Sequence, residues 1–228
     1  VNRVGFAIID DEATREAAKQ EVVRRYLRCS CEFVMGMADQ EALNKADRLL
    51  KELGIGPEYR QVLVAARKVA ADAAEAARAP AKGGEVLDRV FCGAALELPS
   101  GEIITGKNSR LLHAATSAIL NAIKRLAGVP DNIQLLSPLV IESVGNFKRK
   151  TMRGKTASLD VDEALIALAI SSALTPVVQT CLDQLHQLRG CQMHLTHFPT
   201  PGDEAGLRRL GVNLTSDPVY ASQRLYVE

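Results

Sequence analysis

Residues 106–128, Gly-Lys-Asn-Ser-Arg-Leu-Leu-His-Ala-Ala-Thr-Ser-Ala-Ile-Leu-Asn-Ala-Ile-Lys-Arg-Leu-Ala-Gly, organise the second half of this chain. The run predicts a helix that is entered from a strand through a short polar turn, with Gly128 at its end. Before it, residues 89–98 and 102–105 predict two strands that pair as a hairpin across a Pro-Ser-Gly turn. The unit therefore places a His-Ala-Ala triplet, His113–Ala115, in the first half of the helix.

After residue 128 the sequence alternates between strand and helix patterns. Prolines, glycines and capping residues such as Asp160 separate the elements. The alternation predicts an α/β layer fold, in which helices cover a mostly parallel sheet that carries one antiparallel hairpin. The predicted strands are 133–136, 191–198 and 212–215, and the predicted helices are 138–147, 160–173, 175–188 and 203–210.

The first third of the chain, residues 10–79, has apolar side chains at helical spacing and predicts helices only. Asp39 and Gly54 fit the two ends of a middle helix, and Pro57 fits the first turn of the next one. Residues 80–84, Pro-Ala-Lys-Gly-Gly, are the best candidate for a linker. We therefore expect two domains, a helical subdomain over 1–84 and a three-layer α/β/α subdomain over 85–228.

Composition limits the partners that this chain can have. The net charge is +1, so the sequence predicts neither nucleic-acid binding nor attraction to an anionic membrane. No apolar run reaches the roughly 18 residues of a membrane span. The five cysteines are scattered and odd in number, which predicts a reducing, cytoplasmic location. The chain opens on Val1, not Met, with an apolar segment at 4–9, which predicts that it continues a longer polypeptide.

Several segments, spread in order over nearly the whole chain, carry a family resemblance. They are Gly5–Glu12, Ala18–Glu21 with Arg24–Tyr26, Thr105–Ser109, Asn121–Gly128, Leu188–Cys191 and Leu210–Thr215. In these segments the chain resembles the C-terminal half of the bacterial family catalogued as domain of unknown function 1846. The resemblance implies an upstream α/β domain with its own Gly-rich phosphate-type loop. It also implies a helical subdomain followed by one of cytidine-deaminase-like topology, and it implies no particular activity.

The implied topology can be compared with zinc deaminases residue by residue. Their active site needs three metal ligands and one carboxylate. His113 stands where the first ligand would stand, but Ala115 replaces the acid. The helix expected from Thr175-Pro176 has Val177 and Thr180 at the two cysteine positions. We therefore expect the fold of a deaminase without its metal site, and we predict no metal and no cofactor.

The turn before the 106–128 helix is a candidate anion site, since helix-start N–H groups and a nearby lysine attract phosphate. Its predicted contacts are Gly106, Lys107, Asn108 and Ser109, although the full phosphate-loop spacing is missing. A basic run that includes Lys148 and Arg153 could close over the anion as a lid. The alternatives are a hairpin end followed by a Ser-capped helix, and a solvated basic loop.

The other candidate site residues have simpler interpretations. His194 and His197 lie three positions apart in a predicted strand, which puts them on opposite faces and favours core or surface histidines. Cys92 could reach a cleft but fits a buried thiol. Ser216 and Asp217 follow the last strand, where ligands gather in α/β sheets, or they form a simple Asp-Pro turn.

Two functions follow from these observations. The first is a domain that binds a phosphorylated or nucleotide-like metabolite without a metal and works with the upstream domain of the same polypeptide. The second is an assembly module, in which the apolar stripe and the Ala-rich face of the 10–79 helices build a homo-oligomer. The sequence does not decide whether the chain is an enzyme.

Overall fold

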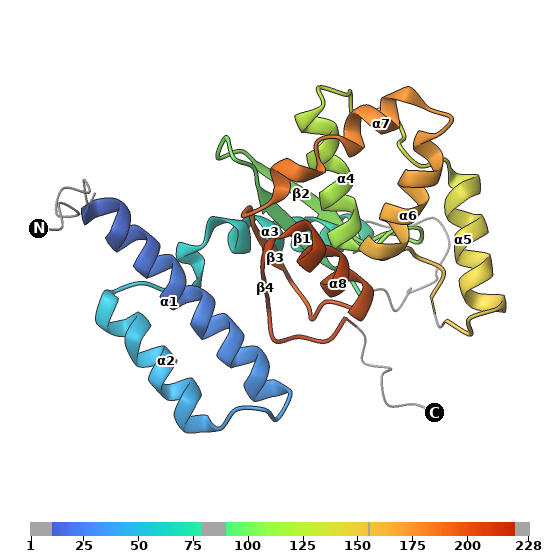
Figure 1. The fold of residues 1–228 in the computed structure, drawn as a ribbon. Helices are drawn as coiled ribbons and strands as arrows, with labels where there is room; N and C mark the ends of the chain where they lie inside the picture. Colours follow the sequence, from blue (N-terminus) through green and yellow to red (C-terminus); the bar gives the residue numbers. More distant parts are fainter. Residues whose placement is uncertain (1–10, 79–89, 155, 222–228) are drawn as a thin grey trace, which may run out of the picture. The chain divides into compact units, whose positions relative to one another are not determined.

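The computed structural model describes residues 11–78, 90–154 and 156–221. Within these residues the chain is a mixed α/β structure with eight α-helices and one four-stranded mixed sheet (Figure 1). Its contacts separate two compact units, Val1–Arg60 and Gln61–Glu228. The apolar opening segment at 4–9 and the expected linker at 80–84 lie outside the described residues.

The first unit consists of α1 (Asp11–Val34), α2 (Gln40–Leu53) and the short 3-10 helix η2 (Pro57–Tyr59). The predicted ends of the middle helix are confirmed. The Asp39 carboxylate accepts a 2.8 Å bond from the Ala42 N–H, and Gly54 ends α2 in the left-handed region at φ +63°. Local capping chemistry therefore set these boundaries, as the sequence predicts.

The second unit contains the sheet, whose strand order is β2-β1-β3-β4. Strand β1 is antiparallel to both of its neighbours, and only β3 and β4 are parallel. The expectation of a mostly parallel sheet is wrong. Strand β1 lies between β2 and β3 and runs opposite to both of them, so two of the three strand pairings are antiparallel. The strands are β1 (Gly93–Glu97), β2 (Ile103–Lys107), β3 (Gln192–Leu195) and β4 (Asn213–Ser216).

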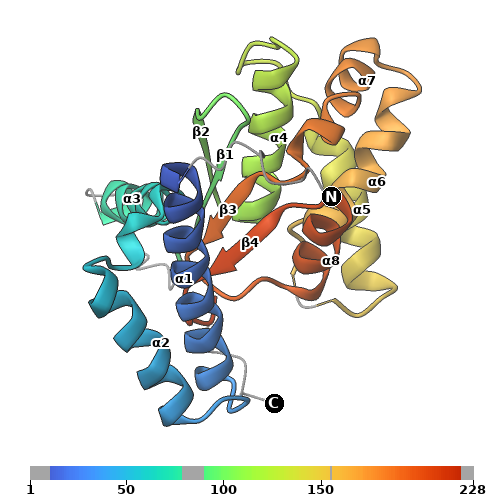
Figure 2. The same ribbon diagram turned by 60° about the vertical axis from the view of Figure 1, so that its left-hand side comes forward.

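Helix α3 (Gln61–Arg78) covers one face of this sheet (Figure 2). The helix approaches β1 so closely that a Cβ on Gly93 would lie 2.1 Å from the Ala66 carbonyl oxygen. Ala95, two positions along the strand, packs with Val62 and Ala66 of the helix. Helix α3 therefore belongs to the sheet unit, and the domain boundary expected at residue 84 falls outside the described residues.

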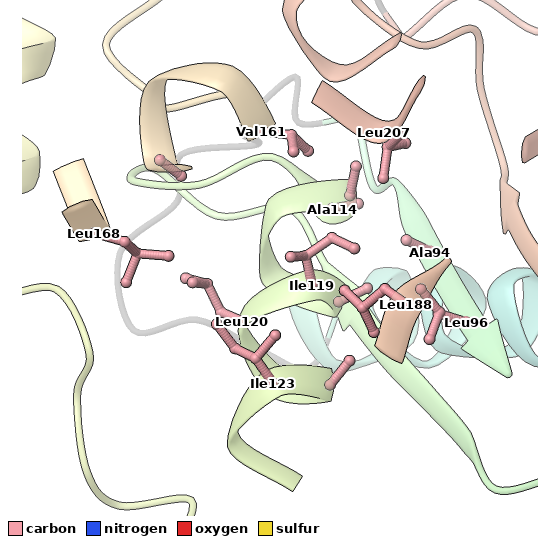
Figure 3. Close-up of a cluster of buried hydrophobic side chains, with 14 of the residues drawn as sticks. Ala94, Leu96, Ala114, Ile119, Leu120, Ile123, Val161, Leu168, Leu188 and Leu207 are labelled. Atoms are coloured by element: carbon pink, nitrogen blue, oxygen red, sulfur yellow. The ribbon is translucent and has the colours of Figure 1, made fainter. Parts of the chain in front are cut away.

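The opposite face of the sheet carries the main hydrophobic core. Ala94 and Leu96 point to this side and pack with α4 (Figure 3). Gly106 on β2 allows the same close approach, because a Cβ there would lie 2.3 Å from the Ala118 nitrogen of α4. The helices in this layer are α4 (Ala114–Leu126), α5 (Pro138–Lys150), α6 (Val161–Ser172), α7 (Pro176–Leu182) and α8 (Pro201–Leu210).

Two predicted elements differ from the structure. Residues 133–136 form irregular bends and not a strand, although Leu135 and Leu136 are buried in the core. The helix expected over 175–188 ends at Leu182 and continues as the 3-10 helix η3 (Leu185–Leu188). Both segments are apolar because the core covers them, and burial alone does not specify an element type. Among the described residues, no helix combines the length and the apolar character needed to cross a membrane.

Candidate functional site

A cavity of about 460 Å³ lies in the sheet unit where α4 begins. Three segments form most of its wall: the turn between β2 and α4, the chain just before α6, and the chain between β3 and α8. Residues 90–92, before β1, and Ala221, after β4, complete it. Its walls are rich in groups that can form hydrogen bonds. The polar side chains that line it belong to Asn108, Ser109, Arg110, His113, Thr156, Ser158, His197 and Thr200.

The turn between β2 and α4 is held in shape by its own side chains. The Asn108 side chain accepts a 2.8 Å bond from the Cys92 N–H and donates a 2.8 Å bond to the Val90 carbonyl. The Ser109 hydroxyl accepts bonds from the N–H groups of Leu111 and Leu112 at 3.2 and 3.1 Å. These contacts fix the turn at the mouth of the cavity and leave Arg110 exposed beside it.

The start of α4 is tied to the segment before α6 through Leu159. The Leu159 carbonyl accepts from the His113 N–H at 3.0 Å and from the Thr116 hydroxyl at 3.1 Å. In return, the Leu159 N–H donates to the Leu111 carbonyl at 2.9 Å. Residues far apart in sequence are therefore held in register on two sides of the cavity.

Asp203, in the first turn of α8, joins the third wall to the other two. Its carboxylate is completely buried and accepts three bonds. These come from His113 Nδ1 at 2.8 Å, the Thr200 hydroxyl at 2.7 Å and the Val161 N–H at 3.1 Å. Burial alone would raise the pKa of Asp203, but the bonds from His113, Thr200 and Val161 outweigh it and lower that pKa. The carboxylate therefore stays ionised and fixes the His113 ring.

The Asp203 contact determines which nitrogen of His113 is available to a ligand. An ionised carboxylate only accepts hydrogen bonds, so Nδ1 of His113 carries the proton that it donates to Asp203. Nε2 is then the acceptor nitrogen of the neutral ring, and His113 is one of the residues that line the cavity. His113 also occupies the N-cap of α4, but its side chain does not cap the first turn of that helix.

His197 is the second histidine of the cavity. It is only 6% exposed, and its Nδ1 atom has no hydrogen-bond partner among the described residues. Burial lowers its pKa to about 4, with a smaller contribution from the nearby His113 and His194, so the ring is neutral at pH 7. A buried polar atom without a partner is costly, and such atoms are commonly satisfied by a ligand or water.

Cys92 also lines the cavity, but it is not an activated nucleophile. Burial, with a smaller contribution from the charge of Asp203, raises the pKa of its thiol to about 11. The protonated thiol is a poor nucleophile at neutral pH. Cys92 is therefore a buried thiol that also reaches a cavity, as the two sequence-based interpretations describe.

The structure separates the six predicted anion contacts. Asn108 and Ser109 line the cavity just described, whereas Gly106 and Lys107 line a different cavity of about 270 Å³ beside α3. Lys148 lies in α5, and its ammonium group donates to the Ser158 carbonyl at 3.1 Å and to Glu163 at 2.9 Å. Arg153 is exposed and has a positive φ of 55°.

Sequence reasoning missed five polar residues of the cavity and the carboxylate that holds His113. The lining residues are Arg110, Thr156, Ser158, His197 and Thr200, and the carboxylate is that of Asp203. Thr200 and Asp203 carry the pattern of an ordinary helix start, and Thr200 does cap α8. Nothing near Asp203 in the sequence indicates His113, which lies ninety positions away. For His197 the only available signal was its place after a buried strand.

No other side chains replace the missing zinc ligands in the described residues. Among residues 11–78, 90–154 and 156–221, no three His, Cys, Asp or Glu side chains are grouped as a metal ion requires. Ala115 is buried in α4, and the Nδ1 atom of His113 is bonded to Asp203. The His113 environment is therefore that of an imidazole–carboxylate pair.

Comparison with known proteins identifies the family. The family model "Domain of unknown function DUF1846, C-terminal" matches residues 58–226, and the corresponding N-terminal model matches residues 1–54. The expected resemblance to the C-terminal half is thus confirmed as to family, but corrected in extent, because the chain spans parts of both domains.

Curated relatives agree with this assignment. UPF0371 proteins of Clostridium botulinum strains Eklund 17B and Alaska E43 are each 41% identical to this chain over 226 residues. That of strain ATCC 19397 is 40% identical over the same length. In each case the match covers 99% of this chain and 43% of the relative, so the chain spans less than half the length of these proteins. The chain belongs to the DUF1846 family, whose relatives are named UPF0371 proteins.

Proposed function

We propose that the cavity at the start of α4 binds a small phosphorylated or nucleotide-like metabolite. The observation that carries the proposal is the polar lining of the cavity, where Arg110, His113 and His197 lie together with the hydroxyls of Ser109 and Ser158. An uncapped helix start in the same wall favours a negative group, because its N–H groups and dipole are directed toward it. Arg110 supplies a positive charge at the mouth, and the hydroxyls of Ser109 and Ser158 suit a polyol or sugar.

The proposed site keeps part of the turn that the sequence predicts as an anion site, but it lies in the cavity at the start of α4 and not beside Gly106 and Lys107. Asn108 and Ser109 stay beside the ligand, and Arg110 takes the role first expected of Lys107. Lys148 and Arg153 remain proposed lid residues, although the contacts of Lys148 with Ser158 and Glu163 hold it within the fold. In the full-length protein, the remainder of the polypeptide is the proposed partner domain.

Isothermal titration with inorganic phosphate and with adenosine monophosphate tests this function. The chain should bind at least one of them, and His197→Phe should weaken that binding at least fivefold because it replaces a polar ring in the cavity wall with a larger apolar one. His186→Gln is the matched control, since His186 is exposed and does not line this cavity. Absence of binding by the unmodified chain, or equal binding by His197→Phe, would contradict the proposal.

We also propose a deaminase-like topology for the sheet unit and a cytoplasmic location for the protein. A strand hairpin followed by a helix with His113 at its start supports the topology, while Ala115, Val177 and Thr180 argue against deaminase chemistry. No disulfide joins any of the five cysteines, all of which lie in the described part of the chain, and this supports a reducing compartment.

Self-association is a second candidate, and one specific observation favours it. Helix α6 has no charged residue after Glu163, yet Ile166 and Ile170 are 63% and 67% exposed, and Leu174, just after the helix, is 89% exposed. A helix that is apolar all round is normally covered on every side. We propose a second copy of the chain as the cover. Sedimentation velocity should show a dimer that Ile166→Lys with Ile170→Lys dissociates, and a monomer at micromolar concentration would exclude it.

A further inference from the structure

The arrangement of Asp203, His113 and the cavity resembles the orienting pair of general-base catalysis. Asp203 holds Nδ1–H of His113 at 2.8 Å, and a second carboxylate oxygen is held by the Val161 N–H at 3.1 Å. The ring therefore has one tautomer and one orientation. A carboxylate in this position fixes the imidazole so that Nε2 can remove a proton from a water or hydroxyl beside it.

The other walls provide what such a base would act upon. The first turn of α4 has N–H groups that no side chain caps, and helix N-termini stabilise negative charge that develops in a transition state. His197 lines the same cavity, and burial lowers its pKa to about 4, so its ring adds no positive charge to this wall at pH 7. Phosphodiesters match this set, because they carry one negative charge and their hydrolysis benefits from a base that activates water.

We infer that the cavity hydrolyses a phosphodiester of a small, nucleotide-like molecule, with His113 as the general base and Asp203 as the residue that positions it. The inference rests on the proposed function, since it requires the same cavity to hold a phosphate group. It adds a reaction class and a substrate class to a binding site.

The reaction balances with water as the only co-reactant. His113 Nε2 takes one proton from water as the water oxygen forms a bond to phosphorus. The bond from phosphorus to one ester oxygen breaks, and that oxygen leaves with the electron pair. The imidazolium then returns its proton to the leaving alkoxide. The products are an alcohol and a phosphomonoester, and no oxidation or reduction takes place.

Bis(p-nitrophenyl) phosphate is a direct probe of this reaction, because its nitrophenolate product is coloured. The chain should release nitrophenolate above the uncatalysed rate, and His113→Gln should lower kcat/KM at least 100-fold. His186→Gln should leave the rate unchanged, since His186 lies outside this cavity. Circular dichroism should show that each variant is folded.

Asp203→Asn tests positioning separately from binding. It should lower kcat at least tenfold with little change in KM, because Asp203 touches the base and not the substrate. Asp203→Glu should restore part of kcat. Asp203 is buried, so His113→Gln at the cavity wall decides the inference if Asp203→Asn does not fold.

The outcomes separate the inference from the binding function. Phosphate binding without nitrophenolate release, or equal rates for the unmodified chain and His113→Gln, would overturn the hydrolytic inference and leave the binding site intact. If the unmodified chain binds neither phosphate nor adenosine monophosphate, the proposed function is overturned, and the hydrolytic inference with it.

Discussion

Two aspartate–histidine pairs lie on opposite sides of the same sheet, and they have different surroundings. On the α4 side, Asp203 bonds His113, which lines a cavity. On the α3 side, Asp217 lies 3.4 Å from Nε2 of His194, which is completely buried. The Asp217 carboxylate also bonds the guanidinium of Arg67 at 2.7 and 3.0 Å.

The comparison shows that residue types alone do not define a site. The remaining nitrogen of His194, Nδ1, is bonded to the Thr215 hydroxyl at 2.9 Å, so both ring nitrogens face groups of the protein. His113 has Nδ1 engaged by Asp203, and the residue lines the cavity. The pair on the α3 side therefore serves to hold α3 and the end of β4 together, and the pair on the α4 side is available to a ligand.

The largest expected effect concerns Asp203. Replacement by Asn removes the charge that three donors share inside the protein, and breaking a buried charged network of this kind costs about 3 kcal/mol. Urea unfolding of the chain measures this loss. A loss below about 1 kcal/mol would show that the network around Asp203 does not stabilise the fold.

The next effect is the pH dependence that His197 contributes. Its pKa is lowered to about 4 in the folded chain, whereas an unfolded histidine titrates near 6.5. The unfolded state therefore binds a proton first as the pH falls. The stability is complete above about pH 6.5 and is lost progressively toward pH 4, by at most about 3 kcal/mol.

His197→Gln should flatten the stability curve in this interval, measured by urea unfolding at several pH values. The comparison of curves isolates His197 from His113 and His194, which remain in both proteins. Parallel curves for the variant and the unmodified chain would show that His197 is not a buried neutral imidazole.

A smaller effect is expected at Asp217. Burial alone would raise its pKa, but the adjacent His194 ring and the bonds from Arg67 lower it to about 2. This carboxyl stabilises the fold above the unfolded pKa of about 3.9, and the contribution is lost as the pH falls toward 2. Asp217→Asn should cost about 2 kcal/mol at pH 7, less than Asp203→Asn, because the Arg67 side chain is half exposed. It should leave phosphate binding unchanged, which titration calorimetry can check.

The smallest expected effects distinguish the cationic residues. Arg110→Ala should weaken phosphate binding about fivefold, or roughly 1 kcal/mol, because one exposed charge at the mouth is lost. Lys107→Ala should change it less than twofold, since Lys107 lines the other cavity. A larger loss of phosphate binding in Lys107→Ala than in Arg110→Ala would instead favour the anion site that the sequence predicts, beside Gly106 and Lys107.

The sequence predicted what depends on local chemistry. Capping by Asp39 and Asp160 and the left-handed Gly54 follow from neighbouring residues, and the helices they delimit are confirmed. The sheet was predicted with the wrong strand directions, because pairing between β1 and β3 depends on contacts about a hundred residues apart. Gly106 was interpreted as a close approach to phosphate, whereas the close approach is to the backbone of α4.

The site was predictable only in part for the same reason. His113 stands out within its own segment, and Ser109 was placed beside the correct helix start. Asp203 gives His113 its orientation, but it belongs to a helix ninety positions later that appears ordinary in the sequence. Burial of His197 is likewise a property of the assembled walls and has no local signal.

The central claim is that the α4-side pair, and not the α3-side pair, faces a ligand. The chain has four histidines, so a long-range ¹H–¹⁵N spectrum of the imidazole rings, recorded during titration with inorganic phosphate, tests this directly. We predict saturable shifts for His113 and His197, with His194 and His186 unchanged. Shifts confined to His194, equal shifts of all four rings, or none at His113 and His197 would contradict the account.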